Sequence, residues 1–221
     1  MELKVLGICG SPVKGGNTET FLREALKAAE EIEGVRTELV TLAGREIADC
    51  RHCNWCVTGQ EEGKFCANQD DMMELYPKML EADALLLATP VYFGRLSGYL
   101  ASVVDRLRAF LHARHYRGAL RNKVGGALAV GWFRNGGGET ALISLVSALL
   151  ALGMIPVNPG VGHHYGAVGL ASYGGMGKFD PKDRLGVLKD GYGLRAARGL
   201  GKRVVEITCL LKAGREALRT S

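Results

Sequence analysis

Residues 4–18 read KVLGICGSPVKGGNT, and this stretch decides the fold class. Residues 4–10 are an apolar run that ends in glycine, which predicts a buried β-strand. Residues 17–33 predict a helix, because their apolar members recur at helical spacing: Phe21, Ala25, Ala28 and Ile32. A buried strand is therefore joined to an amphipathic helix by a glycine-rich loop.

The same alternation continues along the chain. Further strands are predicted over residues 35–42, 84–92, 123–131 and 155–161, and further helices over residues 71–80, 97–113, 139–152 and 192–218. Strands that alternate with helices form a parallel sheet covered on both faces. Right-handed crossovers then give an α/β fold, a doubly wound five-stranded parallel sheet in a three-layer α/β/α sandwich.

We expect one domain over residues 1–221, with a cysteine-rich insertion at about residues 46–70. A glycine-rich segment and the C-terminal helix occupy about residues 163–221. The net charge of +5 suits small anionic ligands but is too low for a nucleic-acid-binding surface. The first residues lack the pattern of a signal peptide, so we expect a cytoplasmic protein whose thiols stay reduced.

The most apolar segment is too short to span a membrane. Residues 140–177 contain no Asp, Glu, Lys or Arg, but the uninterrupted apolar part ends at Leu152 and is followed by Gly153 and Pro156. A membrane-spanning helix needs about 20 residues. A helix that is apolar on nearly every side is buried on more than one side, which predicts a subunit interface as well as a core contact.

Three loops are candidates for ligand binding, because doubly wound sheets bind ligands at the carboxyl ends of their strands. After the first strand, GSPVKGGNT offers glycines, hydroxyls and a helix N-terminus, as a phosphate site needs. It matches neither the dinucleotide fingerprint nor a Walker loop. The alternative is an ordinary strand–helix turn with Asn17 as N-cap.

The other two loops carry aromatic residues. TPVYFG follows the third strand and offers backbone amides and an apolar wall to a flat ring. GWFRNGGG follows the fourth, where Trp132 suits a ring wall or a buried contact equally well. All three loops fall at one edge of the predicted sheet, so together they predict a site for a phosphorylated, planar ligand.

The chain resembles the flavodoxin-like NAD(P)H-dependent FMN reductase superfamily, and most of all its iron–sulfur flavoproteins. The matching segments are the first loop, the cysteine segment that ends in CANQDDM, the TPVYFG loop, the Asp105-Arg106 pair and the glycine loop after the fourth strand. They cover about residues 1–160, and the last sixty residues match only in having a strand and a helix.

The resemblance implies FMN as cofactor and NAD(P)H as electron donor, with no catalytic side chain required because the flavin carries the chemistry. The implied phosphate-binding residues are Ser11, Lys14, Gly16, Asn17 and Thr18. The implied ring-binding residues are Pro90, Val91, Tyr92, Phe93 and Gly94 on one side, and Gly131 and Trp132 on the other. Members of the superfamily form dimers or tetramers, which implies a homodimer or homotetramer.

Four of the six cysteines lie in one short stretch: Cys50, Cys53, Cys56 and Cys66. Soft thiolates suit a [4Fe–4S] cluster or zinc. The compact Cys-x2-Cys-x2-Cys start resembles bacterial ferredoxin ligation more than a zinc ribbon. In the iron–sulfur flavoproteins the last gap is shorter than the nine residues found before Cys66. At this point a [4Fe–4S] cluster, free or redox-active thiols, zinc and a structural disulfide all remain open.

The function expected from these features is that of an FMN oxidoreductase. It takes hydride from NAD(P)H and passes electrons to a small-molecule acceptor or a ferredoxin-like protein. If the four cysteines hold a [4Fe–4S] cluster, that cluster relays the electrons. Two alternatives stay open: a non-enzymatic, flavodoxin-like FMN electron carrier, and a thiol-based redox-switch protein. The sequence does not distinguish NADH from NADPH, since Arg95 and Arg134 are candidates for a 2′-phosphate partner by position only.

Overall fold

Strand β1 lies inside a parallel sheet, in a computed structural model that describes residues 2–220. The strand order is β2-β1-β3-β4-β5, with β6 also paired to β4, and every pairing between these strands is parallel. This is the flavodoxin-like order. The strands are β1 (Leu3–Cys9), β2 (Val35–Thr41), β3 (Ala84–Pro90), β4 (Val124–Gly131), β5 (Ile155–Val157) and β6 (Ala167–Leu170).

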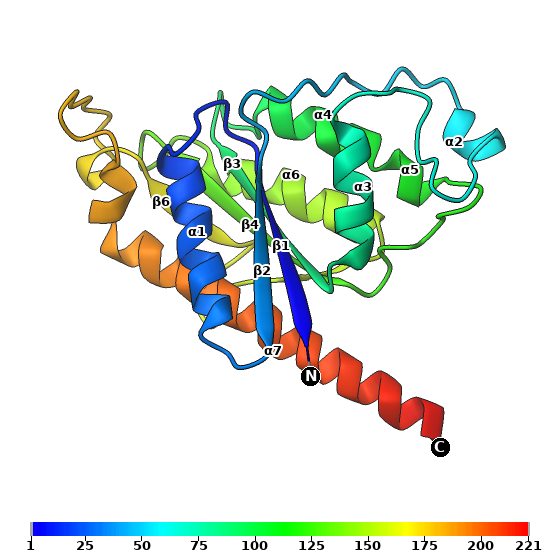
Figure 1. Cartoon of the computed structure of the whole chain (residues 1–221). Coiled ribbons are helices and arrows are strands. Elements are labelled where there is room, and N and C mark those ends of the chain that lie inside the picture. Colours follow the sequence, from blue (N-terminus) through cyan, green and yellow to red (C-terminus); the bar gives the residue numbers. More distant parts are fainter. Residues whose placement is uncertain (1, 221) are drawn as a thin grey trace.

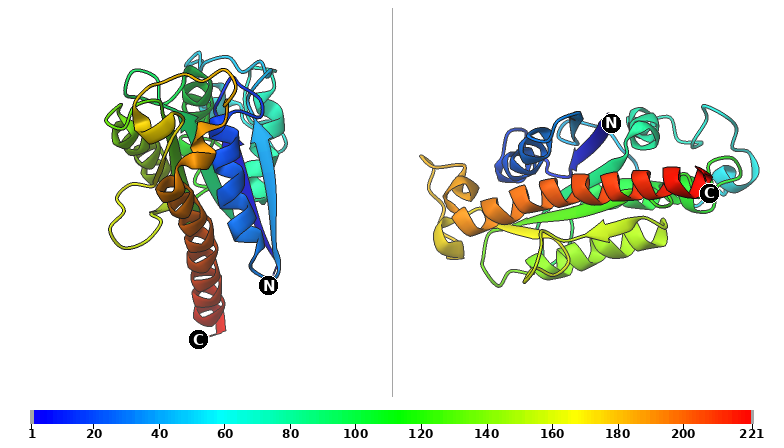
Figure 2. Two further views of the ribbon diagram at one scale, coloured as in Figure 1. Left: turned by 90° about the vertical axis from the view of Figure 1, so that its left-hand side faces the viewer. Right: turned by 90° about the horizontal axis from the view of Figure 1, so that it is seen from below.

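Helices cover both faces of the sheet (Figures 1 and 2), so the three-layer sandwich is confirmed. In β1, Leu6 and Ile8 face one core, which α3 and α6 cover, while Val5 and Cys9 face the other, which α1 and α7 cover. The helices are α1 (Asn17–Glu30), α2 (Trp55–Thr58), α3 (Met72–Glu81), α4 (Gly98–Arg106), α5 (Arg108–Leu111), α6 (Gly138–Ala151) and α7 (Gly191–Thr220), with 3-10 turns η1 (Tyr173–Gly175) and η2 (Gly186–Lys189).

The edge of the sheet beyond β4 differs from the prediction. The single strand expected over residues 155–161 is wrong, because β5 ends at Val157 and β6 pairs with the second half of β4. Between them Pro159 has no N–H to give to a ladder, and Gly160, Gly162 and Gly166 take positive φ angles. The chain therefore leaves the sheet and returns to it, which adds a sixth strand.

The helix expected over residues 97–113 is also wrong as a single element. It divides at Leu107, whose N–H is shared between the carbonyls of Val103 and Val104. The break places Arg106 at the end of α4 and Arg108 at the start of α5. Both arginines line the same small cavity as the cysteines of the insertion.

Helix α7 is 30 residues long, about 45 Å, and its C-terminal end extends past the sheet (Figure 1). Its packing on α1 requires glycine at position 201, because a Cβ there would lie 2.0 Å from the carbonyl oxygen of Ala25. Of the helices described within residues 2–220, none combines the length and the apolarity that crossing a membrane demands.

Two glycines of α7 give a matched test of this packing. We expect Gly201→Ala to lower the free energy of unfolding by about 1–3 kcal/mol, because the new methyl group meets backbone that cannot yield. Gly214→Ala in the same helix has nothing within 4 Å, so it should stabilise the protein by up to about 1 kcal/mol through helix propensity. Urea denaturation of both variants measures the difference, and equal effects would contradict the close contact.

Candidate functional site

Ser97 ties two of the predicted ligand loops together. Its hydroxyl donates to the carbonyl of Gly10 (2.6 Å) and accepts from the N–H of Leu100 (3.2 Å), so it also caps α4. Its own N–H donates to the hydroxyl of Thr89 (2.9 Å). Ser97 is fully buried, and these bonds hold the loops after β1 and β3 at one edge of the sheet. The cap pattern before an apolar helix was visible in the sequence, but its bond to Gly10 was not.

The loop after β1 ends in a helix N-terminus that no side chain caps. The N-cap is Gly16, so the alternative that placed Asn17 there is wrong. Lys14 is exposed at the tip of the loop. The N–H of Gly15 donates to the buried carboxylate of Glu19 (2.8 Å), which also pairs with Arg23 (2.6 Å). Burial acts to raise the pKa of Glu19, but these partners hold it below its usual value.

Asn17 and Ser11 have local partners. The Asn17 amide nitrogen donates to the carbonyl of Arg184 (2.9 Å), and its side-chain oxygen accepts from the N–H of Val187 (3.0 Å). The side chain therefore joins the start of α1 to the segment before α7. Ser11 accepts from the N–H of Val13 (3.1 Å). Their roles toward a phosphate, with those of Lys14, Gly16 and Thr18, stay predictions.

The loop after β3 is a tight turn that exposes two aromatic rings. Tyr92 and Arg95 exchange two backbone hydrogen bonds, and Phe93 and Gly94 between them have φ angles of 51° and 73°. This is the geometry of a type I′ turn, which is unusual for a bulky residue such as Phe93. The side chain of Phe93 is fully exposed and that of Tyr92 about half exposed.

The loop after β4 touches this turn and carries Trp132. A Cβ on Gly137 would lie 2.5 Å from the Cα of Gly94, so only glycine allows the two loops to approach so closely. Trp132 stacks on Phe179 with ring centroids 6.1 Å apart. The hydroxyl of Ser172 donates to the carbonyl of Trp132 (2.6 Å). Nothing in the sequence pattern pointed to Phe179 or Ser172, which lie some forty residues further along the chain.

Arg106 anchors both arms of the cysteine insertion. It is 2% exposed and pairs with Asp70 (2.7 Å), while its terminal nitrogens donate to the carbonyls of Ala48 (2.9 Å) and Asn68 (3.3 Å). Asp70 in turn accepts from the backbone N–H groups of Ala48 (3.0 Å) and Met72 (3.1 Å). The insertion is thereby closed at its base against the end of α4.

The four cysteines line one small cavity of about 20 Å³. They are Cys50, Cys53, Cys56 and Cys66, and none forms a disulfide. Burial raises the pKa of Cys56, and Arg108 opposes that rise. Within residues 2–220 no three His, Cys, Asp or Glu side chains are arranged so that they could hold a metal ion.

The surroundings of this cavity fit an anionic metal–sulfur centre. Four thiols are the donor set of such a centre, and two buried guanidinium nitrogens beside them, the Nε atoms of Arg106 and Arg108, have no hydrogen-bond partner. In the described residues the four thiols are not arranged as ligands of one metal ion, so the donor set supports such a centre and its present geometry does not. Ligation by the four cysteines stays a prediction.

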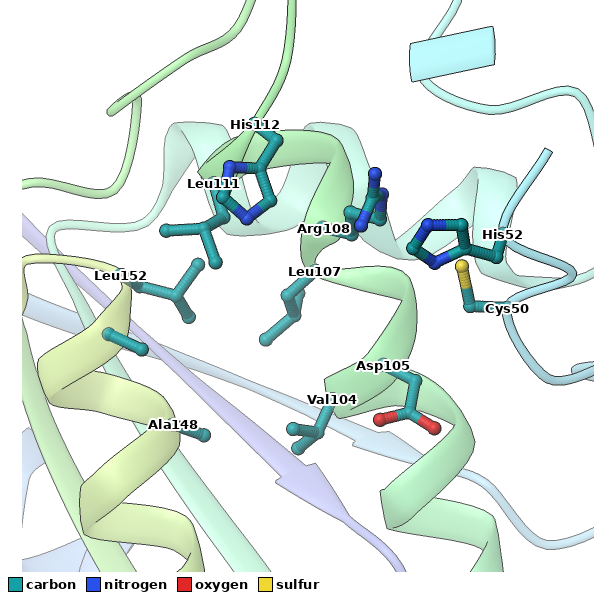
Figure 3. A pocket seen from close by; sticks show the side chains of 11 residues that line it. Cys50, His52, Val104, Asp105, Leu107, Arg108, Leu111, His112, Ala148 and Leu152 are labelled. Carbon is teal, nitrogen blue, oxygen red and sulfur yellow. The ribbon is translucent and has the colours of Figure 1, made fainter. Parts of the chain in front are cut away.

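A second, larger pocket of about 400 Å³ adjoins the cysteine cavity (Figure 3). Cys50 and Arg108 line both spaces. In Figure 3, Cys50, His52 and Arg108 face one another at one side of the pocket, while Leu111 and Leu152 lie at the other. One cysteine of the four is thus accessible from an open, partly apolar depression.

The strand order and the loops at its carboxyl edge define a flavodoxin-like α/β protein. Residues 3–166 match the family model of NADPH-dependent FMN reductases, and the chain belongs to that family. The chain is 43% identical to an iron–sulfur flavoprotein of Methanocaldococcus jannaschii over 95% of its own length and 100% of the relative's. It is 38% identical to an iron–sulfur flavoprotein of Archaeoglobus fulgidus, over 92% of this chain and 96% of the other.

A solved structure shares the fold at lower sequence identity. RosB, crystallised with bound 8-demethyl-8-formylriboflavin-5′-phosphate, aligns with a TM-score of 0.67 and 20% identity, over 99% of this chain and 87% of that one. This match supports the fold alone. The family and the fold class expected from the sequence are both confirmed.

The stability that the Arg106–Asp70 pair contributes should depend on pH. Burial acts to raise the pKa of Asp70, but hydrogen bonds from Arg106 and backbone N–H groups outweigh it and hold the pKa below its usual value. The stability that this pair contributes is therefore present above the unfolded-state pKa, about 4, and is lost as the pH falls through the folded-state pKa.

We expect Asp70→Asn to cost about 3–5 kcal/mol at pH 7, because it leaves a buried guanidinium without its counter-charge. The difference from the parent protein should shrink below about pH 4. Urea denaturation at pH 7 and pH 3.5 measures the loss of stability. Asp71→Asn is the control, because the neighbouring carboxylate of Asp71 accepts a backbone N–H from Glu46 but, within residues 2–220, pairs with no buried arginine. A deficit that does not change with pH would contradict the ion-pair account.

Proposed function

We propose that this protein is an FMN-dependent oxidoreductase that takes electrons from NAD(P)H and passes them to an acceptor. The observation that carries the proposal is the convergence of the loops after β1, β3 and β4 at one edge of a flavodoxin-order sheet. Doubly wound sheets bind their ligands at this edge. Membership of the NADPH-dependent FMN reductase family supports FMN as that ligand.

The residues present fit a phosphorylated flavin. The uncapped N-terminus of α1 and the exposed Lys14 suit the phosphate, aided by Ser11, Gly16, Asn17 and Thr18 through hydroxyl or backbone groups. The turn from Pro90 to Gly94 and the loop at Gly131 and Trp132 suit the two sides of the ring system. FMN, when bound, supplies the hydride and electron chemistry, while these residues bind it and orient it.

We further propose that the four cysteines hold a [4Fe–4S] cluster that relays single electrons to a ferredoxin-like protein or a small acceptor. Two features support this: all four thiols line one cavity, and the buried Nε atoms of Arg106 and Arg108 belong to side chains that line it too. The names of the relatives, iron–sulfur flavoproteins, point the same way. The pocket beside Cys50 gives an acceptor a place to approach the centre.

Assembly into a homodimer or homotetramer is part of the proposal. The outer side of α6 exposes Ile143 and Leu150, which are 40% and 58% exposed in the single chain. These residues belong to the apolar helix for which the sequence predicts burial on more than one side. Light scattering coupled to gel filtration gives the mass in solution, and a mass of one chain would contradict the assembly.

Lys14→Gln tests the phosphate role. We expect the dissociation constant of FMN to rise about two- to fivefold, because an exposed lysine contributes up to about 1 kcal/mol to binding a phosphate. Riboflavin, which lacks the phosphate, should bind equally to both proteins. Lys27→Gln makes the same charge change at the other end of α1 and should leave both constants unchanged. An equal loss for riboflavin would show that Lys14 does not act through the phosphate.

Steady-state oxidation of NAD(P)H by the pure, FMN-loaded protein tests whether the protein is an enzyme or an electron carrier. We expect turnover with at least one of three acceptor classes, which are quinones, nitro compounds and free flavin. An FMN-bound protein that turns over with none of them, and with no ferredoxin, would be an electron carrier instead. NADH and NADPH compared at equal concentration identify the preferred donor.

A further inference from the structure

Two buried nitrogen atoms beside the cysteines have no hydrogen-bond partner in the described part of the chain. They are the Nε atoms of Arg106 and Arg108. Both arginines line the cavity of Cys50, Cys53, Cys56 and Cys66. A buried donor without an acceptor costs about 1–3 kcal/mol. Two such donors at one cavity indicate that an acceptor belongs in it.

Both terminal nitrogens of Arg106, and one of Arg108, have hydrogen-bond partners in the protein. Arg106 uses its terminal nitrogens to hold Asp70, Ala48 and Asn68. Arg108 donates from one terminal nitrogen to the side-chain oxygen of Asn54 (2.6 Å). In each arginine, Nε is the buried nitrogen that has no partner.

The charges around the cavity are also unbalanced. Asp70 neutralises Arg106, whereas no ion pair to Arg108 occurs in residues 2–220. Neutral thiols or a disulfide would leave the Arg108 charge without a counter-charge at this cavity. Four thiolates around a metal centre carry net negative charge and would balance it.

We propose that the Nε–H groups of Arg106 and Arg108 donate hydrogen bonds to the thiolate sulfurs of a metal–thiolate centre, and that Arg108 raises the reduction potential of that centre. The proposal rests on the cysteine centre of the proposed function. Reduction adds one negative charge to the centre, and a cationic N–H donor to sulfur stabilises the more negative state. Arg106 thus has two roles, since it also anchors the insertion.

The test uses Arg108, because substitution of Arg106 would also open the base of the insertion. In the protein purified with its metal centre, we expect Arg108→Met to lower the one-electron reduction equilibrium constant about tenfold, which is 59 mV. Arg108→Lys keeps the charge without the planar Nε donor, so its reduction potential should lie between those of Arg108→Met and the parent protein. An EPR-monitored redox titration measures all three proteins.

Arg114→Met is the matched control. Arg114 contacts the cysteine segment through the carbonyl of Thr58 (2.9 Å) but does not line the cavity. The same loss of charge there should leave the potential unchanged. Circular dichroism and thermal melting of each variant establish that it is folded.

Absence of iron in the pure protein would end the cluster part of the proposed function but not this test. Cobalt(II) added anaerobically to the chain then serves as probe, since thiolate-to-cobalt absorption reports binding. We expect about tenfold weaker cobalt binding in Arg108→Met and no change in Arg114→Met. Three results would overturn the proposal. They are no cobalt binding by the parent protein, an equal reduction potential or cobalt affinity in Arg108→Met and the parent, and an Arg108→Lys protein whose value equals that of the parent.

Discussion

The buried ion pair between Arg106 and Asp70 is the interaction on which the arrangement of the site depends. It closes the cysteine insertion at its base and fixes it to the C-terminal end of α4. The other end of α4 begins at Ser97, which holds the loops after β1 and β3 together. One helix of nine residues, about 13 Å long, therefore sets the spacing between the proposed flavin edge and the cysteines.

A buried ion pair is a costly way to join two segments. Apolar side chains of similar volume often stabilise a protein as much or more. Here the pair leaves a guanidinium N–H facing a cavity lined by thiols, which an apolar contact would not provide. We therefore infer that Arg106 serves the cysteines as well as the fold, and Arg108 adds a second positive charge on the other side of the break at Leu107.

Local patterns in the sequence predicted most of the architecture and few of the contacts. Apolar runs and helical spacing placed β1 to β4 and helices α1, α3, α6 and α7 correctly, since burial on a parallel sheet imposes those patterns, but they did not show the break between α4 and α5. They missed β6, because a four-residue strand that returns to the sheet edge has no periodicity of its own. They also missed the hydrogen bond that the N–H of Val187 donates to Asn17 and the one that Ser172 donates to Trp132, which join residues distant in sequence. No sequence pattern indicates the partners of Arg106, because Asp70, Ala48 and Asn68 lie between 36 and 58 residues before it in the chain.

The proposed iron–sulfur centre of the insertion is the feature on which the proposed electron relay depends. Anaerobic purification followed by absorption spectroscopy and iron and sulfide analysis tests it most directly. The account predicts flavin bands together with a broad shoulder that bleaches on reduction, and about four iron atoms per chain. Flavin bands alone, with no iron and no sulfide in freshly purified protein, would contradict it.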